Sequence, residues 1–249
     1  MASTHAIILA AGLSTRLRPL TDERPKCLLP IGKRTILDRQ LDALRQHGVT
    51  NIVMVVGYKR QAIEEHIRRH HPDLAVRCVV NQNFETTNTL FSLRDALPFC
   101  EGDFLYLNGD VVFDPGVLRR LLDERDGGCL AVDRKQCREE EVKVMVQDGT
   151  VVDIGKHLDP KKSYGEFIGV AKFSGSFAEA FRQQVAAEAK PGNEMQFFEY
   201  ALHTMADKSW LVAIDITGLP CVEVDFAEDY TYAIDLFERG EGANRDADL

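Results

Sequence analysis

Basic side chains crowd a glycine-containing loop that directly follows the first apolar run of the sequence. The run 6–11 leads into Gly12. Four basic residues follow Gly12: Arg16, Arg18, Arg24 and Lys26. A small-residue loop at the carboxyl end of a parallel strand leaves backbone N–H groups free to face an anion, and basic residues beside it add full charges. The pattern predicts a phosphate-binding loop rather than a surface loop of solvated arginines.

Two common phosphate-binding loops do not match this segment. A Walker A loop requires G-x-x-x-x-G-K-[ST], but Lys26 lies between Pro25 and Cys27. A dinucleotide-binding fingerprint requires three glycines and an acidic residue at the end of the second strand. This loop has only Gly12, and the apolar run 52–57 ends without an acid. The loop therefore belongs to another class of phosphate site.

Acidic residues follow two later apolar runs. Asp110 comes just after the run 104–108, where parallel sheets bind ligands, and a carboxylate at that place suits a Mg²⁺ ion. Asp225 ends the run 221–224, and with Glu228 it also has the pattern of a capping box for the last helix. From the residues alone, the role of Asp225 stays open.

Strand and helix patterns alternate over the first 110 residues. Short, nearly continuous apolar runs predict strands that are covered on both faces, at 6–11, 52–57, 75–80 and 104–108. Apolar residues at helical spacing predict helices between them, around 36–44, 63–67 and 90–97. This alternation predicts an α/β fold with a doubly wound, mostly parallel mixed sheet.

The second half of the sequence has a different pattern of predicted secondary structure. The runs 142–146 and 150–154 flank Asp148-Gly149, which predicts a hairpin. Further patterns predict helices at 176–189, 194–206 and 226–237 and strands at 211–216 and 222–224. We expect one domain over residues 1–240, with halves at about 1–115 and 116–240, followed by a polar tail at 241–249.

Charge and composition exclude several classes of protein. Thirty Lys and Arg against 39 Asp and Glu give a net charge of −9, which opposes a nucleic-acid partner. The apolar runs are far below the ~20 residues of a membrane span, and the N-terminus has no signal-peptide pattern. Six scattered cysteines without a CxxC pair suit a reducing compartment. We expect a cytoplasmic protein.

The basic loop resembles the signature loop of the nucleoside-triphosphate transferase family. The matching residues are Ala10-Ala11-Gly12, Thr15-Arg16-Leu17, Pro19, Thr21 and Pro25-Lys26-x-Leu28-Leu29-Pro30, with Ser14 where many members have a second glycine. The segment 81–93 resembles the bacterial phosphocholine cytidylyltransferase branch, with Asn88 at the start of a helix. The resemblance covers nearly the whole chain and weakens from about residue 175 to 220. It implies the nucleotidyltransferase, GT-A-like form of the fold.

The resemblance also implies roles for individual residues. Lys26 would lie on the α-phosphate and the incoming phosphate, and Arg16 on the departing pyrophosphate. Asp110 and Asp225 would hold Mg²⁺, and a parallel sheet could bring both to the same edge. Four residues would frame the base, namely Ala10, Ala11, Gly12 and Asn88, and Lys156 would contact a phosphate. The acceptor pocket would come from the second half, where Tyr164, Glu166, Phe167, Tyr200 and Trp210 occur.

These expectations favour a cytidylyltransferase that joins CMP from CTP to a small phospho-alcohol, such as phosphocholine, or to a short phosphonate. The main alternative is a sugar-1-phosphate nucleotidyltransferase that uses UTP, dTTP or GTP. A glycosyltransferase is disfavoured because Val111-Val112 follow Asp110 in place of a D-x-D motif. A nucleotide-sensing domain without catalysis would not need Lys26 together with two metal-binding acids. The sequence makes no prediction of oligomeric state.

Overall fold

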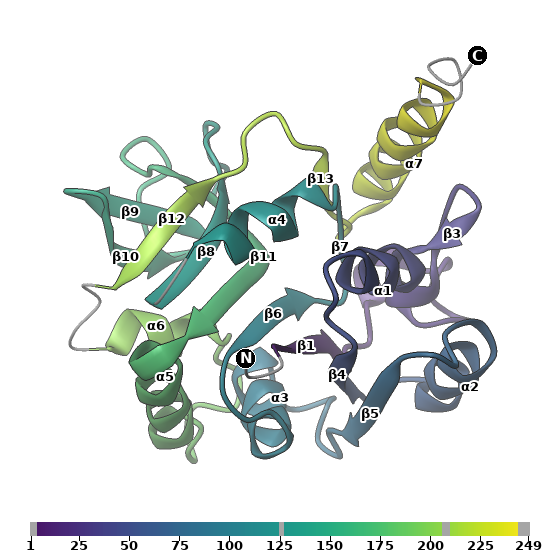
Figure 1. Ribbon diagram of the computed structural model, residues 1–249, viewed down its shortest axis with the longest axis horizontal. Coiled ribbons are helices and arrows are strands. Elements are labelled where there is room, and N and C mark those ends of the chain that lie inside the picture. The colour runs from purple at the N-terminus through teal and green to yellow at the C-terminus, as the bar shows by residue number, and fades with distance from the viewer. Residues whose placement is uncertain (1–3, 125–126, 206–209, 244–249) are drawn as a thin grey trace.

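A nine-stranded mixed sheet forms the centre of the protein (Figure 1). The structure is a computed structural model, and it describes residues 4–124, 127–205 and 210–243. The strands follow the order β10-β9-β11-β6-β1-β4-β5, with β8 beside β11 and β12 beside β8. Their bounds are β1 His5–Ala10, β4 Asn51–Val56, β5 Ala75–Val80, β6 Phe104–Asn108, β8 Gly127–Asp133, β9 Lys143–Gln147, β10 Thr150–Gly155, β11 Gly165–Ser174 and β12 Leu211–Asp215.

The N-terminal part of this sheet is parallel, as the alternating patterns predict. β1 pairs in parallel with β4 and β6, and β4 pairs in parallel with β5. β11 then joins β6 in antiparallel orientation and pairs with β8 and β9 as well. The predicted α/β fold with a mostly parallel mixed sheet is confirmed. Strands of both predicted halves share this sheet, and the division into halves stays a prediction.

Helices cover both faces of the sheet, which explains the continuous apolar strands. In β1, Ile7 and Leu9 pack into one hydrophobic cluster, and Ala6 and Ile8 pack into another. The first cluster includes buried residues of α3 (Thr89–Ala96), α5 (Gly175–Glu188) and α6 (Glu199–Thr204). The second includes residues of α1 (Ile36–Gln46), α2 (Arg60–His70) and α4 (Gly116–Asp123). Successive side chains of a strand point to opposite faces, so a strand buried on both needs apolar residues throughout.

A third, smaller core joins the loop after β1 to the C-terminal segment. It contains Leu17 of the loop, Val112, Val224 and Ala233. The elements here are short: β2 Pro30–Ile31, β3 Arg34–Thr35, β7 Val111–Phe113, β13 Cys221–Glu223 and the long last helix α7 Ala227–Ala243. The remaining helical turns are 3₁₀ segments at Thr15–Leu17, Lys26–Leu28 and Leu97–Phe99. Figure 1 shows α7 projecting away from the body of the molecule.

The hairpin prediction is confirmed in detail. β9 and β10 pair in antiparallel orientation across Asp148 and Gly149, whose φ angles are 50° and 80°. Two successive positive φ angles are the requirement of a type I′ turn, which Asp-Gly meets at low steric cost. The register shifts between Val151 and Asp153, so this short hairpin contains an irregularity.

Several expectations about element bounds are wrong. β5 is partly exposed instead of covered on both faces, because it lies at the edge of the sheet. α6 begins at Glu199, not at 194. α7 extends to Ala243, so the predicted tail begins inside a helix, and residues 244–249 lie outside the described part. The strands β8 and β11 and the helix α4 were not predicted.

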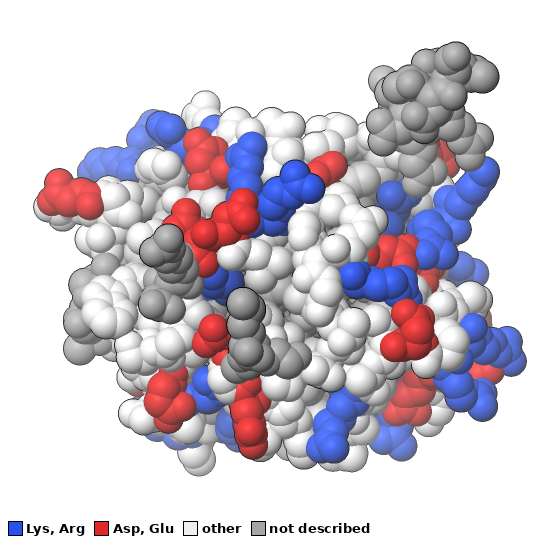
Figure 2. All heavy atoms as spheres, viewed as in Figure 1, with Lys and Arg blue, Asp and Glu red and all other residues white. Residues whose placement is uncertain are grey.

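Acidic and basic side chains are interspersed over the face that Figure 2 shows. Several charged side chains of the described residues form ion pairs, for example Arg45 and Asp73 at 2.8 Å. Within the described residues, no helix combines the length and the apolar character that crossing a bilayer requires.

Candidate active site

The loop after β1 opens onto a cavity of about 450 Å³. The loop is fixed at several points: Ser14 takes a left-handed conformation with φ of 52°, and its carbonyl oxygen accepts a hydrogen bond from the Thr21 hydroxyl at 2.9 Å. Leu17 anchors the loop in the third core, where it is 2% exposed. A non-glycine residue with positive φ is uncommon and persists where its surroundings hold it. The phosphate-binding loop predicted from the sequence is thus a structured wall of the cavity.

The structure brings all nine predicted site residues to one place. Eight of them line the main cavity: Ala11, Gly12, Arg16, Lys26, Asn88, Asp110, Lys156 and Asp225. Ala10 lines a small adjoining hollow, which it shares with Gly12, Lys26 and Asp110. These residues come from the end of β1 and the loop after it, the start of α3, the turn after β6, the end of the hairpin and the segment after β13, so only the folded chain assembles them.

Lys26 lies at the centre of the charged groups. Its Nζ is 2.8 Å from Oδ2 of Asp110 and 2.8 Å from Oδ1 of Asp225. Arg16 Nη2 reaches the other oxygen of Asp225 at 2.9 Å. Burial by itself lowers the pKa of the Lys26 ammonium, but the charges of Asp110 and Asp225 outweigh burial and hold this pKa above its usual value. Lys26 is therefore a firmly protonated cation between two carboxylates.

Asp110 is positioned by the turn that follows β6. A side chain on the preceding residue, Gly109, would place its Cβ 2.6 Å from the Leu9 carbonyl oxygen, so the turn packs against β1 only with glycine. The Oδ1 atom of Asp110 is buried and has no hydrogen-bond partner among the described residues. A buried oxygen without a hydrogen-bond partner destabilises a protein unless a bound ligand supplies the missing interaction. The Asp110 carboxylate is therefore suited to coordinate a cation.

Gln40 of α1 supports this turn from behind. Its Nε2 donates hydrogen bonds to the carbonyl oxygens of Asn108 at 2.7 Å and of Val111 at 2.8 Å, on either side of Asp110. The side chain is 1% exposed. Sequence reasoning missed Gln40, because nothing in the local pattern of an amphipathic helix marks one buried polar residue as a support for a distant turn.

Asp225 reaches the site by a route that differs from the expectation. The strand before it, β13, pairs in antiparallel orientation with β7 in a separate two-stranded sheet, so the parallel sheet does not deliver Asp225. A hydrogen bond of 3.0 Å from the Val224 N–H to the Asp110 carbonyl holds the two segments together. The expectation that a parallel sheet presents both acids is therefore wrong, although both acids do meet.

The start of α7 is capped by a different residue. Asp229 Oδ2 accepts hydrogen bonds from the backbone N–H groups of Asp225 at 3.0 Å and of Phe226 at 2.8 Å. Both carboxylate oxygens of Asp225 instead face the cations Lys26 and Arg16. Burial raises the pKa of Asp225, but the Lys26 charge and hydrogen bond, followed by Arg16, hold it below its usual value. The side chain of Asp225 thus belongs to the charged cluster rather than to the helix cap.

A third acid, Glu223, completes the cluster, and sequence reasoning missed it. Burial, followed by the charges of Asp110 and Asp225, raises the pKa of Glu223 well above its usual range. Asn108 Nδ2 lies 3.5 Å from its Oε1. The raised pKa favours the neutral form of Glu223, and that form adds no third negative charge to the site. The alternation in the short run 221–225, which places Glu223 and Asp225 on the same side of the chain, was the available signal.

Asn88 and Lys156 both contact the segment 195–197. Asn88 caps α3, because its Oδ1 accepts a hydrogen bond from the Thr89 N–H at 2.8 Å, and its Nδ2 donates to the Met195 carbonyl at 3.3 Å. Lys156 follows β10, and its ammonium lies 5.0 Å from the centre of the Phe197 ring. Both side chains line the cavity, so each is within reach of a bound ligand.

A second group of charged residues also lines the cavity. Lys135 Nζ lies 2.6 Å from Oε2 of Glu166 and 3.2 Å from Oε1 of Glu141. Of the five residues expected in an acceptor pocket, only Glu166 lines the cavity. Tyr164, Phe167 and Tyr200 pack against the hydrophobic core, and Trp210 is 57% exposed. The aromatic residues that do line the cavity are Phe84, Phe197, Phe226 and Tyr232.

The charged groups of the site are suited to bind a polyphosphate ligand. Lys26 and Arg16 supply positive charge, and Asp110 and Asp225 supply the oxygen ligands that Mg²⁺ prefers. Backbone groups of the loop after β1 line the same cavity. Cations and carboxylates side by side are the usual means of holding a phosphate chain and neutralising charge that develops on it.

Comparison with known proteins finds matches over most of the chain. A family model described as the MobA-like NTP transferase domain matches residues 6–190. CMP-5'-(3-aminopropyl)phosphonate synthase of Streptomyces rubellomurinus is 32% identical over 92% of this chain, which spans 38% of that protein's length. CTP:phosphoglutamine cytidylyltransferase of Campylobacter jejuni is 25% identical over 93% of this chain and 99% of its own.

Solved structures share the fold. CTP:phosphocholine cytidylyltransferase from Streptococcus pneumoniae superposes with a TM-score of 0.80 at 21% identity and covers 94% of this chain and 99% of that chain. The inositol-1-phosphate CTP transferase of T. maritima gives a TM-score of 0.78 at 22% identity, over 96% of this chain and 98% of that chain. The mixed sheet and its helices are therefore a known arrangement.

Proposed function

Because the chain belongs to the family of MobA-like NTP transferase domains, we propose that it is a cytidylyltransferase. It transfers CMP from CTP to a small acceptor that carries a phosphate or phosphonate group, and it releases pyrophosphate. The observation that carries the proposal is the Lys26 ammonium, held 2.8 Å from each of two carboxylates in the wall of the cavity. The names of these two relatives support CTP as the donor and a small acceptor that carries a phosphate or phosphonate group.

In this reaction an oxygen of the acceptor's phosphate attacks the α-phosphorus of CTP in line with the departing pyrophosphate. The bond to the acceptor oxygen forms as the bond to the β-phosphate oxygen breaks, so the protein's task is positioning and charge neutralisation. Lys26 pairs with the α-phosphate and the incoming phosphate, and Arg16 pairs with the β- and γ-phosphates. Both already face anionic oxygens in the structure, so phosphate oxygens can take over these contacts.

Asp110 and Asp225 hold Mg²⁺ in this proposal. The buried Oδ1 of Asp110, which has no partner among the described residues, fits a ligand atom for that ion. Bound Mg²⁺ supplies positive charge to the phosphate oxygens and needs only one or two carboxylates besides them. The raised pKa of Glu223 favours its neutral form, which limits the negative charge beside these two acids.

The base lies against Ala10, Ala11 and Gly12 in this proposal, and Asn88, which lines the same cavity, contacts it as well. An amide nitrogen carries two hydrogens, so Asn88 can donate one to the base while it holds the Met195 carbonyl. Lys156 reaches a phosphate from the hairpin side. The acceptor's substituent lies toward Lys135 and Glu166, where charged groups favour a polar or charged headgroup over an apolar one.

The test is a panel of the four NTPs against phosphorylated acceptors, with pyrophosphate release measured in the presence of Mg²⁺. The acceptors are phosphocholine, an aminoalkyl phosphonate, phosphoglutamine and glucose 1-phosphate. We expect CTP with one of the first three to give the highest kcat/KM. Preferred use of UTP, dTTP or GTP with the sugar phosphate would establish the rival activity. Tight CTP binding without turnover on any acceptor would point to a nucleotide sensor.

A further inference from the structure

Two histidines and an aspartate gather on the surface near the end of the hairpin, outside the charged cluster of the active site. Asp153 lies in β10, His157 in the turn that follows it, and His203 in the last turn of α6. His203 Nδ1 is 2.7 Å from Asp153 Oδ1, and His157 Nε2 is 3.2 Å from Asp153 Oδ2. The two imidazole rings meet edge to face, with 4.8 Å between their centres.

We propose that Asp153, His157 and His203 form a second metal site, which binds a transition ion of the Zn²⁺ class. One potential ligand atom from each residue lies within 4.8 Å of the other two. Ligands that share one Zn²⁺ at ~2.0–2.2 Å lie roughly 3.3 Å apart, so small rotations of the side chains are enough. The imidazoles are 51% and 41% exposed, which gives them room to rotate and gives water access to the remaining position.

The donor set separates this site from the one in the cavity. Two imidazole nitrogens and one carboxylate suit Zn²⁺, Co²⁺ or Ni²⁺, whereas Mg²⁺ prefers oxygen ligands only. The Asp153 carboxylate is oriented by the Ile154 N–H, which donates to Oδ1 at 2.8 Å. Such support of a ligand from the backbone is a common feature of metal sites. The two sites therefore favour different ions, a hard cation at Asp110 and Asp225 and a softer transition-metal ion at this surface site.

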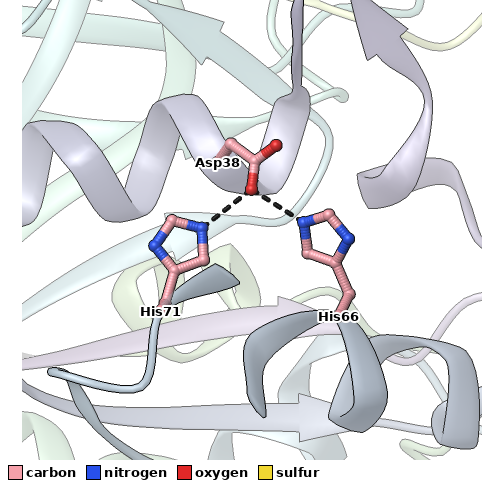
Figure 3. A group of neighbouring side chains, drawn as sticks. All are labelled: Asp38, His66 and His71. Carbon is pink, nitrogen blue, oxygen red and sulfur yellow. Dashed lines mark hydrogen bonds and ion pairs between the residues drawn. The ribbon is translucent and has the colours of Figure 1, made fainter. Parts of the chain in front are cut away.

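A second histidine–aspartate cluster in the same protein shows by contrast what excludes a metal. Asp38 of α1 lies between His66 and His71, and its Oδ1 is 2.7 Å from the Nε2 of each (Figure 3). The Nδ1 of His71 faces the guanidinium of Arg45 at 3.0 Å, so that nitrogen accepts and Nε2 carries the proton. A metal on Nε2 would force a proton onto Nδ1, against a cation.

Asp38, His66 and His71 form an inner cluster, as opposed to the outer cluster of Asp153, His157 and His203, and they also make structural contacts. Asp38 Oδ2 accepts a hydrogen bond from the Thr35 N–H at 2.9 Å, and this bond is part of the capping box of α1. His71 is 1% exposed and Asp38 is 6% exposed. The inner cluster therefore joins α1 to α2. The outer cluster has no such guanidinium in the contacts that the structure describes around its histidines.

A bound ion in the outer site would fix a segment next to the active site. His157 directly follows Lys156, whose ammonium lines the cavity, and α6 packs against β10. An ion that bridges His157 and His203 ties the turn after β10 to α6. We expect it to raise thermal stability and to limit the movement of Lys156, whether or not the chain has cytidylyltransferase activity.

The test is Zn²⁺ titration of the untagged full chain by calorimetry, with Mg²⁺ present throughout, and Co²⁺ absorption as a second readout. We expect one Zn²⁺ per chain and a rise in melting temperature. His203→Gln and His157→Gln should each weaken binding at least about tenfold. His70→Gln, at an exposed histidine outside the site, and Asp225→Asn, in the cavity, should both bind as the wild type does.

Three results would overturn the proposal: absence of Zn²⁺ binding in the wild type, unchanged binding in both His203→Gln and His157→Gln, or loss of binding in Asp225→Asn, which would place the ion in the cavity. These readouts measure the ion directly and need no nucleotide. Failure of the nucleotide and acceptor panel would therefore leave this result standing, and the reverse also holds.

Discussion

Glu199, the first residue of α6, should make the stability of the protein depend on pH between about 5 and 8. Its side chain is 6% exposed, and its Oε2 has no hydrogen-bond partner among the described residues. Burial raises the pKa of Glu199 from 4.5 to about 7, although its own backbone and the charge of Lys156 act in the opposite direction. The folded protein therefore holds a proton that the unfolded chain releases at lower pH.

The magnitude follows from the two pKa values. The folded state binds more protons than the unfolded state between pH 4.5 and about 7, so the free energy of unfolding falls as pH rises through that window. Each pKa unit corresponds to ~1.36 kcal/mol, which gives a loss of about 3 kcal/mol once both states are ionised. Between pH 5 and pH 8 the change is about 2.5 kcal/mol. Glu199→Gln keeps the shape of the side chain and removes this titration.

Urea unfolding of the wild type and of Glu199→Gln at a series of pH values measures the effect. Between pH 5 and pH 8, we expect the free energy of unfolding of the variant to rise by about 2.5 kcal/mol relative to that of the wild type. Every other titrating group is common to both proteins. Glu64→Gln, an exposed glutamate of α2, is the matched control and should run parallel to the wild type. Parallel pH profiles for Glu199→Gln and the wild type would refute the assignment of a buried, protonated Glu199.

Three further predictions concern the candidate active site. Lys26→Ala should lower kcat ~10²-fold or more while circular dichroism stays unchanged, because one electrostatic donor is worth a few kcal/mol in a transition state; near-normal turnover would remove Lys26 from the mechanism. Asp110→Asn and Asp225→Asn should each abolish Mg²⁺-dependent turnover, and the double variant should cost little more than either, whereas additive losses would show separate roles. Gln40→Leu should lower the free energy of unfolding by ~1–3 kcal/mol and raise the Mg²⁺ concentration needed for half-maximal activity. Gln46→Leu, at an exposed position of the same helix, is the control. An unchanged Mg²⁺ requirement would show that Gln40 has a purely structural role.

The parts of the fold that follow from local pattern were predictable from the sequence. The strands β1, β4 and β6 are buried on both faces, so their apolar runs are continuous, and helices with a regular apolar spacing separate them. The hairpin follows from Asp148-Gly149, since both residues adopt positive φ. The basic loop was predictable because several charges lie close together in the sequence and need no distant partner to be noticed.

The remaining parts depend on pairings between distant segments. β11 is buried along its whole length and contacts β6, β8 and β9, yet its sequence has no turn signal that marks it as the junction of the sheet. Asp225 reaches Asp110 through the pairing of β13 with β7, about 110 residues apart in the chain. Gln40 and Glu223 acquire their roles only from neighbours that the fold brings to them. Periodicity within a window cannot carry such information.

The position of Lys26 between Asp110 and Asp225 has a thermodynamic consequence for how ligands arrive, given the proposed function. A divalent ion that binds alone competes with the Lys26 ammonium for the charges of Asp110 and Asp225, and so weakens the pairing of an ammonium that is only 12% exposed. A nucleotide that arrives with the ion gives the same ammonium a phosphate to pair with. Each ligand therefore increases the affinity of the site for the other, and reciprocity requires the two increases to be equal. In this arrangement the lysine couples the two binding equilibria, so that the empty site keeps its charges paired until both ligands are present.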